Sequence, residues 1–313
     1  MSAVRRSMLF TPVNISRFVQ NVWKHNPDMV VLDLEDSVAP GEKASARAMV
    51  QGASQYVARC GMEVAVRINH NTVADDCDAV IWPEICAVVL PKAESPDQIK
   101  VLDTLLTKLE GERTIPNQSV EIMPMIETAL GVQNAYDIAS SSQRIKLFGV
   151  LGEADLTADL GASFDALQTQ DVLAYPRAEI RLVARSLGLT LNGREWVPGK
   201  ATIADYSDPE ALERSMKASW EAGCRSTFCI HPRQVAVANH HLRPTELEVE
   251  EALEKLRVYI EADLANLPYG VLRGRVVNAR AAQAAQEVIA YAQLCSTEDT
   301  KKARRAIEFE FER

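Results

Sequence analysis

Short apolar, β-rich runs recur along the 313-residue chain, and the stretches between them have the composition of helices. The eight runs are Ser7–Val13, Met29–Asp36, Glu63–Asn69, Ala87–Ala93, Val120–Glu127, Ile145–Gly152, Leu189–Asn192 and Ser226–His231. Runs such as MVVLDL and AVVL are continuously apolar rather than alternating, which is typical of parallel strands covered on both faces. Eight strands that alternate with helices predict an α/β protein with the (β/α)8 arrangement of a TIM barrel, usually about 250 residues long.

The competing arrangement is a doubly wound open sheet. Such a sheet normally has a glycine-rich turn after its first strand, whereas this sequence reads FTPVN. We therefore predict that residues 1–232 form a TIM barrel catalytic domain and that residues 233–313 form a C-terminal helical extension.

The extension has an amphipathic helical pattern over Thr245–Leu267, then a short extended piece and an Ala-rich helix over Val271–Leu294. An amphipathic segment beyond a closed barrel needs another surface to cover it, so we expect the extension to pack on a neighbouring subunit. The mixed-charge tail after Leu294 is expected to be a solvated or frayed terminus.

Charge and cysteine usage narrow the partners and the compartment. With 34 Lys and Arg against 43 Asp and Glu, the net charge of -9 repels phosphate backbones, so nucleic acid is not expected as a partner. No apolar run is long enough for a signal peptide or a membrane span, so no membrane association is expected. The six cysteines form no C-x-x-C pair, which indicates reduced thiols in a cytoplasmic protein.

Polar residues end several of the apolar runs, and in a barrel these carboxyl ends of the strands point at the active site. They are Asp33, Glu35, Asp36, Arg67, Asn69, Lys92, Glu94, Glu127, Glu153, Asp155 and His231. The set has no Ser-His-Asp or Cys-His order. Its many carboxylates favour a site for a hard cation, because Mg²⁺ prefers oxygen ligands and keeps part of its shell for water and substrate.

Glu127 and Asp155 are the predicted metal ligands, because they end adjacent strands about 4.8 Å apart and could share one ion. Arg67 ends a neighbouring run, where its guanidinium would bind a substrate carboxylate at two points. Each residue alone is more often an ion-pair or capping residue; their position together on one rim favours function.

Other rim residues have two readings each. Asp33, Glu35 and Asp36 could hold water in the second shell of a metal, or pair with Lys43 and Arg47 on the next helix. Lys92 could neutralise the carboxylates, in a structural or a catalytic role. His231 precedes a proline, so it either faces a ligand at the barrel mouth or simply forms the loop.

The order of several motifs is similar to that of a known family. The motifs are SMLFTPVN, VVLDLEDSVAPGEKASAR, VAVRIN, VVLPKAES, MPMIETALGVQNA, FGVLGEADLTADLG and CIHPRQV. Together they resemble the HpcH/HpaI aldolase/citrate lyase superfamily, and within it the citrate lyase beta subunit branch with its stand-alone CitE-like members. The resemblance covers residues 7–294, nearly the whole chain.

The resemblance implies a TIM barrel that binds Mg²⁺ and makes or breaks a carbon–carbon bond beside a CoA-type thioester. Carried over by motif, Glu127 and Asp155 bind the metal and Arg67 holds the substrate carboxylate. The residues implied to line the acyl-CoA entrance are Phe10, Thr11, Pro12, Ile230, His231 and Pro232. A homotrimer or hexamer, with the C-terminal segment reaching a neighbour's active site, is also implied.

Two segments depart from the family pattern. Active thioester lyases of this branch usually carry an Asp in a G-x-x-V-D-x-P segment, whereas the chain reads GRVVNARAAQAA, with Asn278 at the acid position. An amide does not shuttle protons, so another group would have to substitute. Asn192 stands where relatives often have Asp, and an apparently longer loop follows it, which suggests a different acyl group or acceptor.

The predicted function is a Mg²⁺-dependent lyase that cleaves or forms a short 3-hydroxy dicarboxylic acyl-CoA, such as citramalyl-, malyl- or citryl-CoA. Its small-molecule partners would be this acyl-CoA and a 2-oxoacid. Three alternatives stay open: a thioesterase of the same acyl-CoA, a free-acid pyruvate aldolase, and a catalytically weakened binding or assembly subunit, which Asn278 favours.

Overall fold

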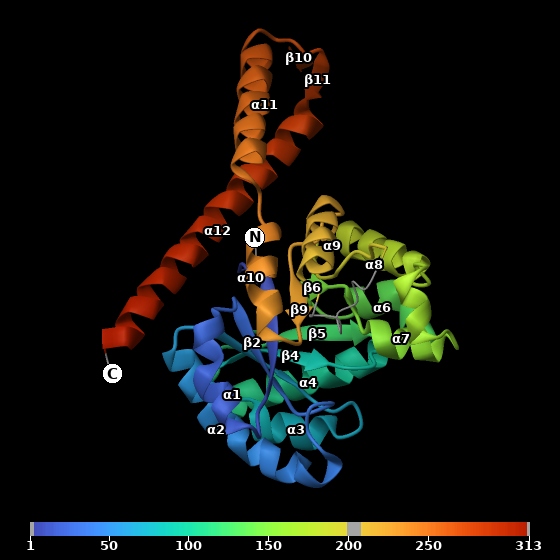
Figure 1. The fold of residues 1–313 in the computed structure, drawn as a ribbon, viewed down its shortest axis with the longest axis vertical. Coiled ribbons are helices and arrows are strands. Elements are labelled where there is room, and N and C mark those ends of the chain that lie inside the picture. The colour runs from blue at the N-terminus through green and yellow to red at the C-terminus, as the bar shows by residue number, and fades with distance from the viewer. Residues whose placement is uncertain (1–2, 199–207, 312–313) are drawn as a thin grey trace. The chain divides into compact units, whose positions relative to one another are not determined.

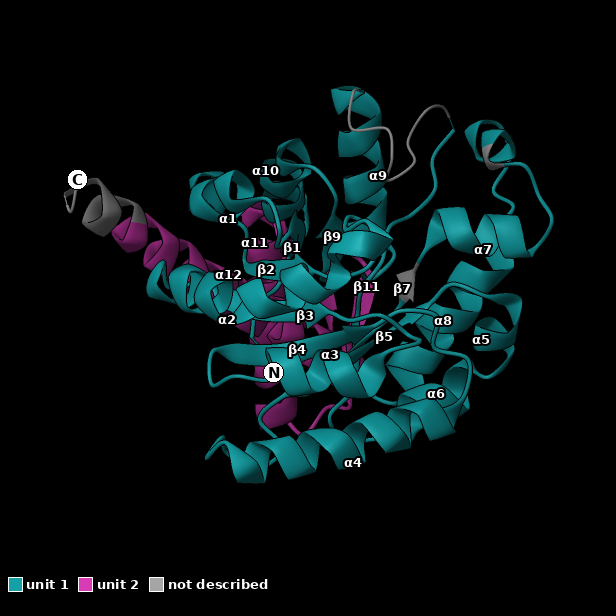
Figure 2. Cartoon of the chain, turned by 90° about the horizontal axis from the view of Figure 1, so that it is seen from below, with its two compact units in different colours: residues 1–242 teal, residues 243–313 magenta. Residues whose placement is uncertain are grey.

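The computed structural model describes residues 3–198 and 208–311. The chain divides into two compact units, residues 1–242 and residues 243–313, which are coloured separately in Figure 2. The first unit ends ten residues beyond the predicted boundary of 232. The reason is that helix α10 (Pro232–His241) packs on the strands of the first unit.

Parallel strands form the centre of the first unit (Figure 1). Seven of them make one sheet in the order β7-β5-β4-β3-β2-β1-β9. Their bounds are β1 (Ser7–Pro12), β2 (Met29–Asp33), β3 (Glu63–Arg67), β4 (Ile85–Leu90), β5 (Glu121–Ile126), β7 (Val150–Leu151) and β9 (Thr227–Cys229). All pairings within this sheet are parallel, as the continuously apolar runs predict.

Two further strands, β6 (Leu147–Phe148) and β8 (Thr190–Leu191), pair in parallel with each other. Backbone hydrogen bonds link this pair to the larger sheet on both sides. Ile122 donates to the Arg144 carbonyl at 3.1 Å, and Gly193 donates to the Ser226 carbonyl at 2.9 Å. The sheet is therefore parallel and curled.

Each of the eight predicted runs overlaps a strand, and the sixth overlaps two. Gly149 separates β6 from β7 with φ of +122°, a conformation that L residues with a side chain rarely adopt. A Cβ at this position would also collide with the Asn192 carbonyl. The glycine thus lets the chain bend where β8 approaches.

Helices follow the strands along the chain and lie outside the sheet (Figure 1). The α-helices are α1 (Ser16–Asn21), α2 (Lys43–Arg59), α3 (Val73–Val80), α4 (Pro96–Glu112), α5 (Ala129–Gln133), α6 (Ala135–Ser140), α7 (Glu153–Asp159), α8 (Ala174–Ser186), α9 (Pro209–Glu221) and α10. Short 3₁₀ helices cover Val22–His25, Pro40–Glu42 and Phe164–Gln168. Local signals fix several starts; Ser95 and Gln98, for example, form a capping box at α4.

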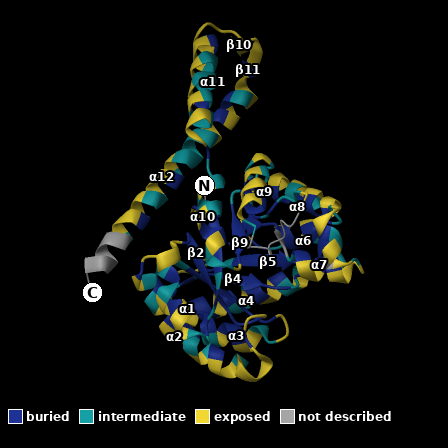
Figure 3. Cartoon of the chain, viewed as in Figure 1, coloured by how far each residue is buried: buried dark blue, intermediate teal, exposed yellow. Residues whose placement is uncertain are grey.

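The core lies on and within the curled sheet, whose strands are dark blue in Figure 3. Buried side chains that the strands turn toward one another form one cluster. It contains Met8, Met29, Val31, Ala65, Ala87, Val89, Met123, Met125, Leu147 and Phe228. This filled interior leaves the polar residues at the carboxyl ends of the strands as the floor of any cavity there.

The second unit consists of helix α11 (Glu246–Leu264), an antiparallel hairpin of β10 (Tyr269–Leu272) and β11 (Arg275–Asn278), and helix α12 (Ala279–Phe311). The sequence predicts a single extended piece here; the second strand exists because Arg273 and Gly274 both adopt positive φ, as a tight hairpin turn requires. The tail after Leu294, expected to be solvated or frayed, is helical rather than frayed, since α12 continues to Phe311. Every helix in the described residues is too short or too polar to span a membrane.

Candidate active site

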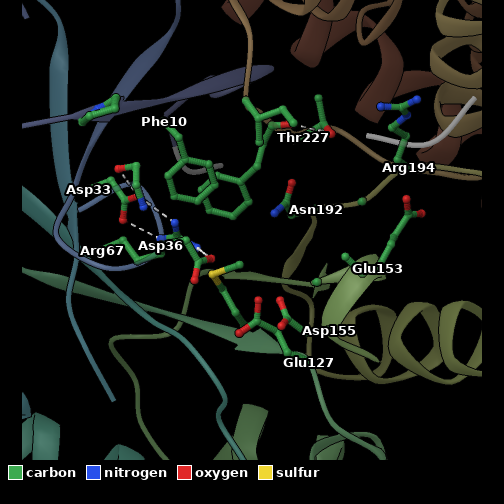
Figure 4. A pocket seen from close by; sticks show the side chains of 18 residues that line it. Phe10, Asp33, Asp36, Arg67, Glu127, Glu153, Asp155, Asn192, Arg194 and Thr227 are labelled. Atoms are coloured by element: carbon green, nitrogen blue, oxygen red, sulfur yellow. Dashed lines mark hydrogen bonds and ion pairs between the residues drawn. The ribbon is translucent and has the colours of Figure 1, made fainter. Parts of the chain in front are cut away.

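A cavity of about 380 Å³ opens at the carboxyl ends of the strands in the first unit (Figure 4). Its walls come from the ends of seven strands or the turns after them. The lining residues are Phe10, Pro12, Asp33, Asp36, Ser37, Arg67, Met125, Glu127, Gly152, Glu153, Ala154, Asp155, Asn192, Gly193, Arg194, Thr227, Phe228 and Ile230. The predicted residues Arg67, Glu127 and Asp155 therefore share one cavity.

Arg67 ends β3 and is buried, with 6% of its surface exposed. Its Nε and Nη2 donate to the two carboxylate oxygens of Asp33, each at 2.7 Å. Its Nη1 lies 2.9 Å from Glu35 and 3.0 Å from Asp36. The register places Arg67 beside Asp33, because the two residues pair across β2 and β3.

These contacts contradict one of the two readings of the DLED carboxylates, the pairing with Lys43 and Arg47. Lys43 donates to the backbone carbonyls of Leu34 and Glu35, at 3.0 and 2.9 Å, rather than to an acidic side chain. Arg47 pairs with Asp76 at 2.5 Å. Arg67, not the helix lysine or arginine, is thus the ion-pair partner of this acidic segment.

An aromatic wall adjoins the arginine. The rings of Phe10 and Phe228 stack with centroids 4.8 Å apart, and the Arg67 guanidinium lies 4.5 Å above the Phe10 ring centroid. The cavity is therefore bounded by apolar faces as well as by charges, which keeps water from surrounding the ionic groups.

Glu127 follows β5 and is 3% exposed. One of its oxygens accepts the backbone N–H of Lys92 at 3.0 Å, in a turn where Lys92 adopts φ of +51°. Gly152 lies against the carboxylate, because a Cβ at position 152 would be 2.6 Å from the Glu127 Cγ. The contact that Lys92 makes here is through its backbone.

Two acidic residues in the first turn of α7 have different surroundings. Glu153 is buried and pairs with Arg177 at 3.1 Å. Asp155 is exposed and lies beside Glu127 in the cavity (Figure 4). This leaves Asp155 as the partner of Glu127, as the strand ends predict.

The pKa shifts indicate a shortage of positive charge. Burial raises the pKa of Glu127 to about 7; the Lys92 N–H opposes this shift, and the charge of Asp155 adds to it. Burial likewise raises the pKa of Glu35 to about 7, with Arg67 opposing and Asp36 and Glu127 adding to the shift. By contrast, hydrogen bonds from Arg67 and Ser37 outweigh the burial of Asp33 and lower its pKa.

We define the rim cluster as Asp33, Glu35, Asp36, Arg67, Glu127 and Asp155. It holds five carboxylates and one guanidinium, so a divalent cation would supply the charge that it lacks. No group of three or more His, Cys, Asp or Glu in the described residues is arranged to hold a metal ion. A Mg²⁺ ion does not need three protein ligands, because it is commonly bound by one or two carboxylates while water and substrate complete its coordination shell. Glu127 and Asp155 offer two such carboxylates.

The residues predicted to line an acyl-CoA entrance separate into two groups. Phe10, Pro12 and Ile230 line the cavity. Thr11 is buried and its hydroxyl donates to the Leu9 carbonyl at 3.4 Å. His231 and Pro232 begin α10, where the His231 ring accepts the Arg233 N–H at 3.2 Å.

Asn278 belongs to the second unit, at the end of β11. It is exposed, and its side-chain oxygen accepts the Ala281 N–H at 3.1 Å, which is the bond of a helix N-cap. Its visible role is thus to begin α12.

Sequence reasoning does not place Ser37, Met125, Gly152, Arg194, Thr227 or Phe228 at the site, although all of them line the cavity. It singles out Asn192 only as a departure from a family pattern. The place of Asn192 at the end of the seventh run is a sufficient signal, by the same rule that selects Arg67. Residues 199–207 of the loop after it lie outside the described residues.

Comparison with known protein families gives one match to this chain. The sequence model of the family described as HpcH/HpaI aldolase/citrate lyase matches residues 6–232. The chain belongs to this family.

Curated relatives within the HpcH/HpaI aldolase/citrate lyase family match nearly the whole chain. The chain is 30% identical over 291 residues to the citrate lyase subunit beta of Leuconostoc mesenteroides subsp. cremoris, covering 91% of this chain and 92% of that one. It is 28% identical over 315 residues to an L-malyl-CoA/beta-methylmalyl-CoA lyase of Cereibacter sphaeroides, covering 93% and 95%.

Solved structures share the fold. CitE of Mycobacterium tuberculosis in complex with magnesium, acetoacetate and coenzyme A has a TM-score of 0.68 at 24% identity and covers 93% of this chain and 99% of its own. The same protein with magnesium and pyruvate has a TM-score of 0.57 at 26% identity, covering 78% and 92%. These matches show the same α/β fold.

Proposed function

We propose that this protein is a Mg²⁺-dependent carbon–carbon lyase that cleaves or forms a short 3-hydroxy dicarboxylic acyl-CoA, such as citramalyl-, malyl- or citryl-CoA. Cleavage would give acetyl-CoA, or a homologue of it, and a 2-oxoacid. The observation that carries the proposal is the under-neutralised pair Glu127 and Asp155 in one cavity with Arg67. The names of the relatives, citrate lyase beta subunit and malyl-CoA lyase, point to the same reaction class.

Glu127 and Asp155 would hold the metal ion, and Gly152 leaves the Glu127 carboxylate the space that it occupies. When bound there, Mg²⁺ would acidify the substrate hydroxyl and stabilise the charge that develops on it. The CitE structures bind magnesium together with small oxoacids, which supports the same ion here.

Arg67 would orient the carboxylate of the acyl group. Asp33 holds two of its nitrogens and so fixes the plane of the guanidinium. Asp36 is a weaker partner because its side chain is 64% exposed, so a substrate carboxylate could replace it at Nη1. Phe10 and Phe228 would keep water from the reacting carbon atoms.

We propose further that the first unit is a closed (β/α)8 barrel. The hydrogen bonds of Ile122 with Arg144 and of Gly193 with Ser226 link successive neighbours on either side of β6 and β8. With β6 and β7 counted as one interrupted strand, eight strands follow one another, each with a helix after it. A closed barrel would place all rim residues around one mouth.

The second unit is proposed to pack on a neighbouring copy in a homotrimer or hexamer. It exposes several large apolar side chains, which a partner surface would cover. They are Leu247, Leu253, Ile260, Leu264, Leu267, Tyr269, Val271 and Val276. Light scattering of the purified protein tests this; a monomer at micromolar concentration would contradict it.

The proposed compartment is the cytoplasm. The six cysteines form no disulfide with one another, and burial raises the pKa of four of them, Cys77, Cys86, Cys224 and Cys229, to about 12. Such thiols are unreactive and suit a reducing compartment.

A specific observation favours a second candidate, a catalytically weakened binding or assembly subunit. Asn278 caps α12 and offers no titratable group. If the native chain is weakened for this reason, Asn278→Asp should raise lyase activity strongly. Because Asp also caps helices well, the substitution should leave stability unchanged, so a gain in activity would not reflect folding.

Incubation with a panel of acyl-CoAs and Mg²⁺, read by mass spectrometry, tests the proposal. Lyase activity predicts a shorter acyl-CoA together with a 2-oxoacid. Free CoA with an intact hydroxy acid would instead show a thioesterase, and turnover of free hydroxy acids would show a pyruvate aldolase. Glu127→Gln is the control, because it keeps the shape of the site and removes the charge.

A further inference from the structure

Arg177 is a buried arginine that contacts Glu153, one of the residues that line the cavity. It lies in the first turn of α8 and is 6% exposed. Its guanidinium donates in three directions. Nη2 donates to Glu153 at 3.1 Å, Nη1 to Asp171 at 2.5 Å and Nε to the Arg194 carbonyl at 3.2 Å.

These three acceptors come from three different segments of the chain. Glu153 begins α7, Asp171 precedes α8, and Arg194 follows β8. The donors of a guanidinium lie in one plane with fixed directions, so an arginine fixes its acceptors relative to one another, which a lysine ammonium does not do. Arg177 therefore fixes the first turn of α7 against α8 and against the segment after β8.

Helix α7 also carries Asp155, two residues after Glu153. With 3.6 residues per turn, side chains two residues apart point in directions that differ by about 200°. Figure 4 agrees with this, because Asp155 lies beside Glu127 whereas the carboxylate of Glu153 points away from them. The direction of Glu153 toward Arg177 thus determines the direction of Asp155 toward Glu127.

The helix depends on such contacts, because it has only seven residues and so little stability of its own. At its far end, Asp159 accepts the Ala129 N–H at 2.7 Å, in the turn after β5. Leu156 packs in the core with none of its surface exposed. In the first turn, the ion pair of Glu153 with Arg177 is a buried contact that opposes rotation of the helix.

We propose that Arg177 is a positioning residue for the metal pair. By holding Glu153, it fixes the rotation of α7 and so keeps the Asp155 carboxylate beside that of Glu127. The inference rests on the proposed function, in which Glu127 and Asp155 bind Mg²⁺. Arg177 acts through Glu153 and the helix, without contact to the ion or the substrate.

Charge and geometry predict opposite effects for the loss of Arg177. Removal of a positive charge near the cavity leaves Glu153 uncompensated, and Coulomb attraction alone would then strengthen the binding of a cation. Loss of the fixed rotation of α7 would weaken it, because Asp155 would no longer be held beside Glu127. The sign of the change therefore separates the two effects.

Calorimetric titration of Mg²⁺ measures this sign. Arg177→Met should weaken Mg²⁺ binding by about 10- to 100-fold, the range typical of residues that orient metal ligands. Arg177→Lys keeps the charge and should still weaken binding by about 10-fold, so it provides the test if Arg177→Met does not fold. Unchanged or tighter binding in a folded variant would overturn the inference.

Arg144→Met is the matched control, because it also removes a buried guanidinium that pairs with two carboxylates. It should leave the dissociation constant for Mg²⁺ within about 2-fold of the native value, as expected for a cation that does not hold a metal-binding helix. Thermal melting shows that each variant is folded. If Arg144→Met weakens binding as much as Arg177→Met, the effect follows from lost stability, and the inference is wrong.

A double-mutant cycle with Glu153→Gln tests the route through Glu153. In the Glu153→Gln protein, the additional Arg177→Met substitution should change the Mg²⁺ dissociation constant by less than about 3-fold, because the ion pair is already broken. Weakening as large as in the native protein would show that Arg177 does not act through Glu153.

Hydrogen exchange without metal completes the test and needs neither Mg²⁺ nor turnover. In the presence of a chelator, the backbone amides of residues 153–159 should exchange at least about 10-fold faster in Arg177→Met than in the native protein, measured by mass spectrometry. Arg144→Met should change this rate by less than about 2-fold, because a short helix exchanges by local opening. Equal exchange in Arg177→Met and the native protein would overturn the inference, whereas absence of Mg²⁺ binding by the native protein would refute the proposed function instead.

Discussion

Two ionic clusters in the first unit use the same residue types to opposite effect. The first lies between helix α4 and the segment before β6, where Arg144 pairs with Asp103 at 2.6 Å and with Glu110 at 2.8 Å. We call these three residues the lower network. Burial alone would raise the pKa of Glu110, but hydrogen bonds from Arg144 and from backbone N–H groups outweigh it and lower the pKa. In the rim cluster, burial instead raises the pKa of Glu127 and of Glu35 to about 7.

The difference lies in how each carboxylate is satisfied. Glu110 accepts hydrogen bonds from Arg144, Gln118 and Val120, so its charge is fully compensated within the protein. Glu127 accepts one backbone N–H and faces Asp155. The carboxylate charge of the rim cluster is therefore only partly compensated within the protein, which suits the binding of a cation, whereas the lower network stabilises the fold.

Substitution of Glu127 should have the largest effect on activity, and it should not lower the free energy of unfolding. Glu127→Gln removes a metal ligand, so Mg²⁺-dependent turnover should fall by about 10³-fold or more. Stability without Mg²⁺ at pH 8 should not fall, because the substitution removes a poorly compensated buried charge. Steady-state kinetics and urea unfolding measure the two effects; retained turnover would refute the assignment.

Substitution in the lower network should lower the free energy of unfolding and leave Mg²⁺ binding unchanged. Arg144→Met leaves Glu110 and Asp103 without their cation and should cost about 3–5 kcal/mol in the free energy of unfolding. The midpoint of urea unfolding reports this loss. Mg²⁺ affinity of the folded variant should match that of the native protein, and a large loss of affinity would show that the two clusters are not independent.

The two clusters should also respond at opposite ends of the pH range. A pKa raised to about 7 from 4.5 means that Glu127 contributes stability fully below about pH 4.5 and loses it as pH rises through 7, roughly 3 kcal/mol without metal. Asp103 and Glu110, with lowered pKa values, contribute stability above their unfolded pKa and lose it as pH falls below about 4.

Thermal melting between pH 3 and pH 9 separates these contributions. With a chelator, stability should decline from about pH 5 to pH 8 in the native protein, and this decline should be reduced in Glu127→Gln. Mg²⁺ should restore stability at pH 8 more than at pH 6. If the profile of Glu127→Gln is identical to that of the native protein, the Glu127 carboxyl does not cause the decline.

The smallest expected effect concerns the space beside Glu127. Gly152→Ala puts a Cβ against the Glu127 carboxylate and should weaken Mg²⁺ binding by about 10-fold with little loss of stability. Gly41→Ala is the control, because nothing lies within 4 Å of its Cβ position. Calorimetric titration of Mg²⁺ compares them, and equal affinities in the two variants would show that the glycine has no part in the site.

The positions of the strands and of the rim residues follow largely from the sequence, because the carboxyl ends of parallel strands lie at one edge of the sheet. The apolar runs predict every strand of the curled sheet, and the residues that end them include Arg67, Glu127 and Asp155. The break between β6 and β7 was not predictable from periodicity, since it depends on how closely Asn192 approaches Gly149.

Partners of the side chains were harder to predict than their positions. The spacing in DLEDSVAPGEKASAR allows pairing with Lys43 or Arg47, but strand register places Asp33 beside Arg67 instead. The hairpin of the second unit was missed because Arg273 is not a typical residue for positive φ. Local spacing does not encode the partner of Asp33, because that partner depends on the register between β2 and β3.

Proton release on Mg²⁺ binding tests the central claim most directly. Calorimetric titration at pH 7 in buffers of different ionisation enthalpy gives the number of protons released per ion bound. Because the pKa of Glu127 is raised to about 7, binding at the rim should release about half a proton or more in the native protein and in Arg144→Met, and clearly less in Glu127→Gln. Binding without proton release, or equal release in all three proteins, would contradict the assignment of the rim cluster as the metal site.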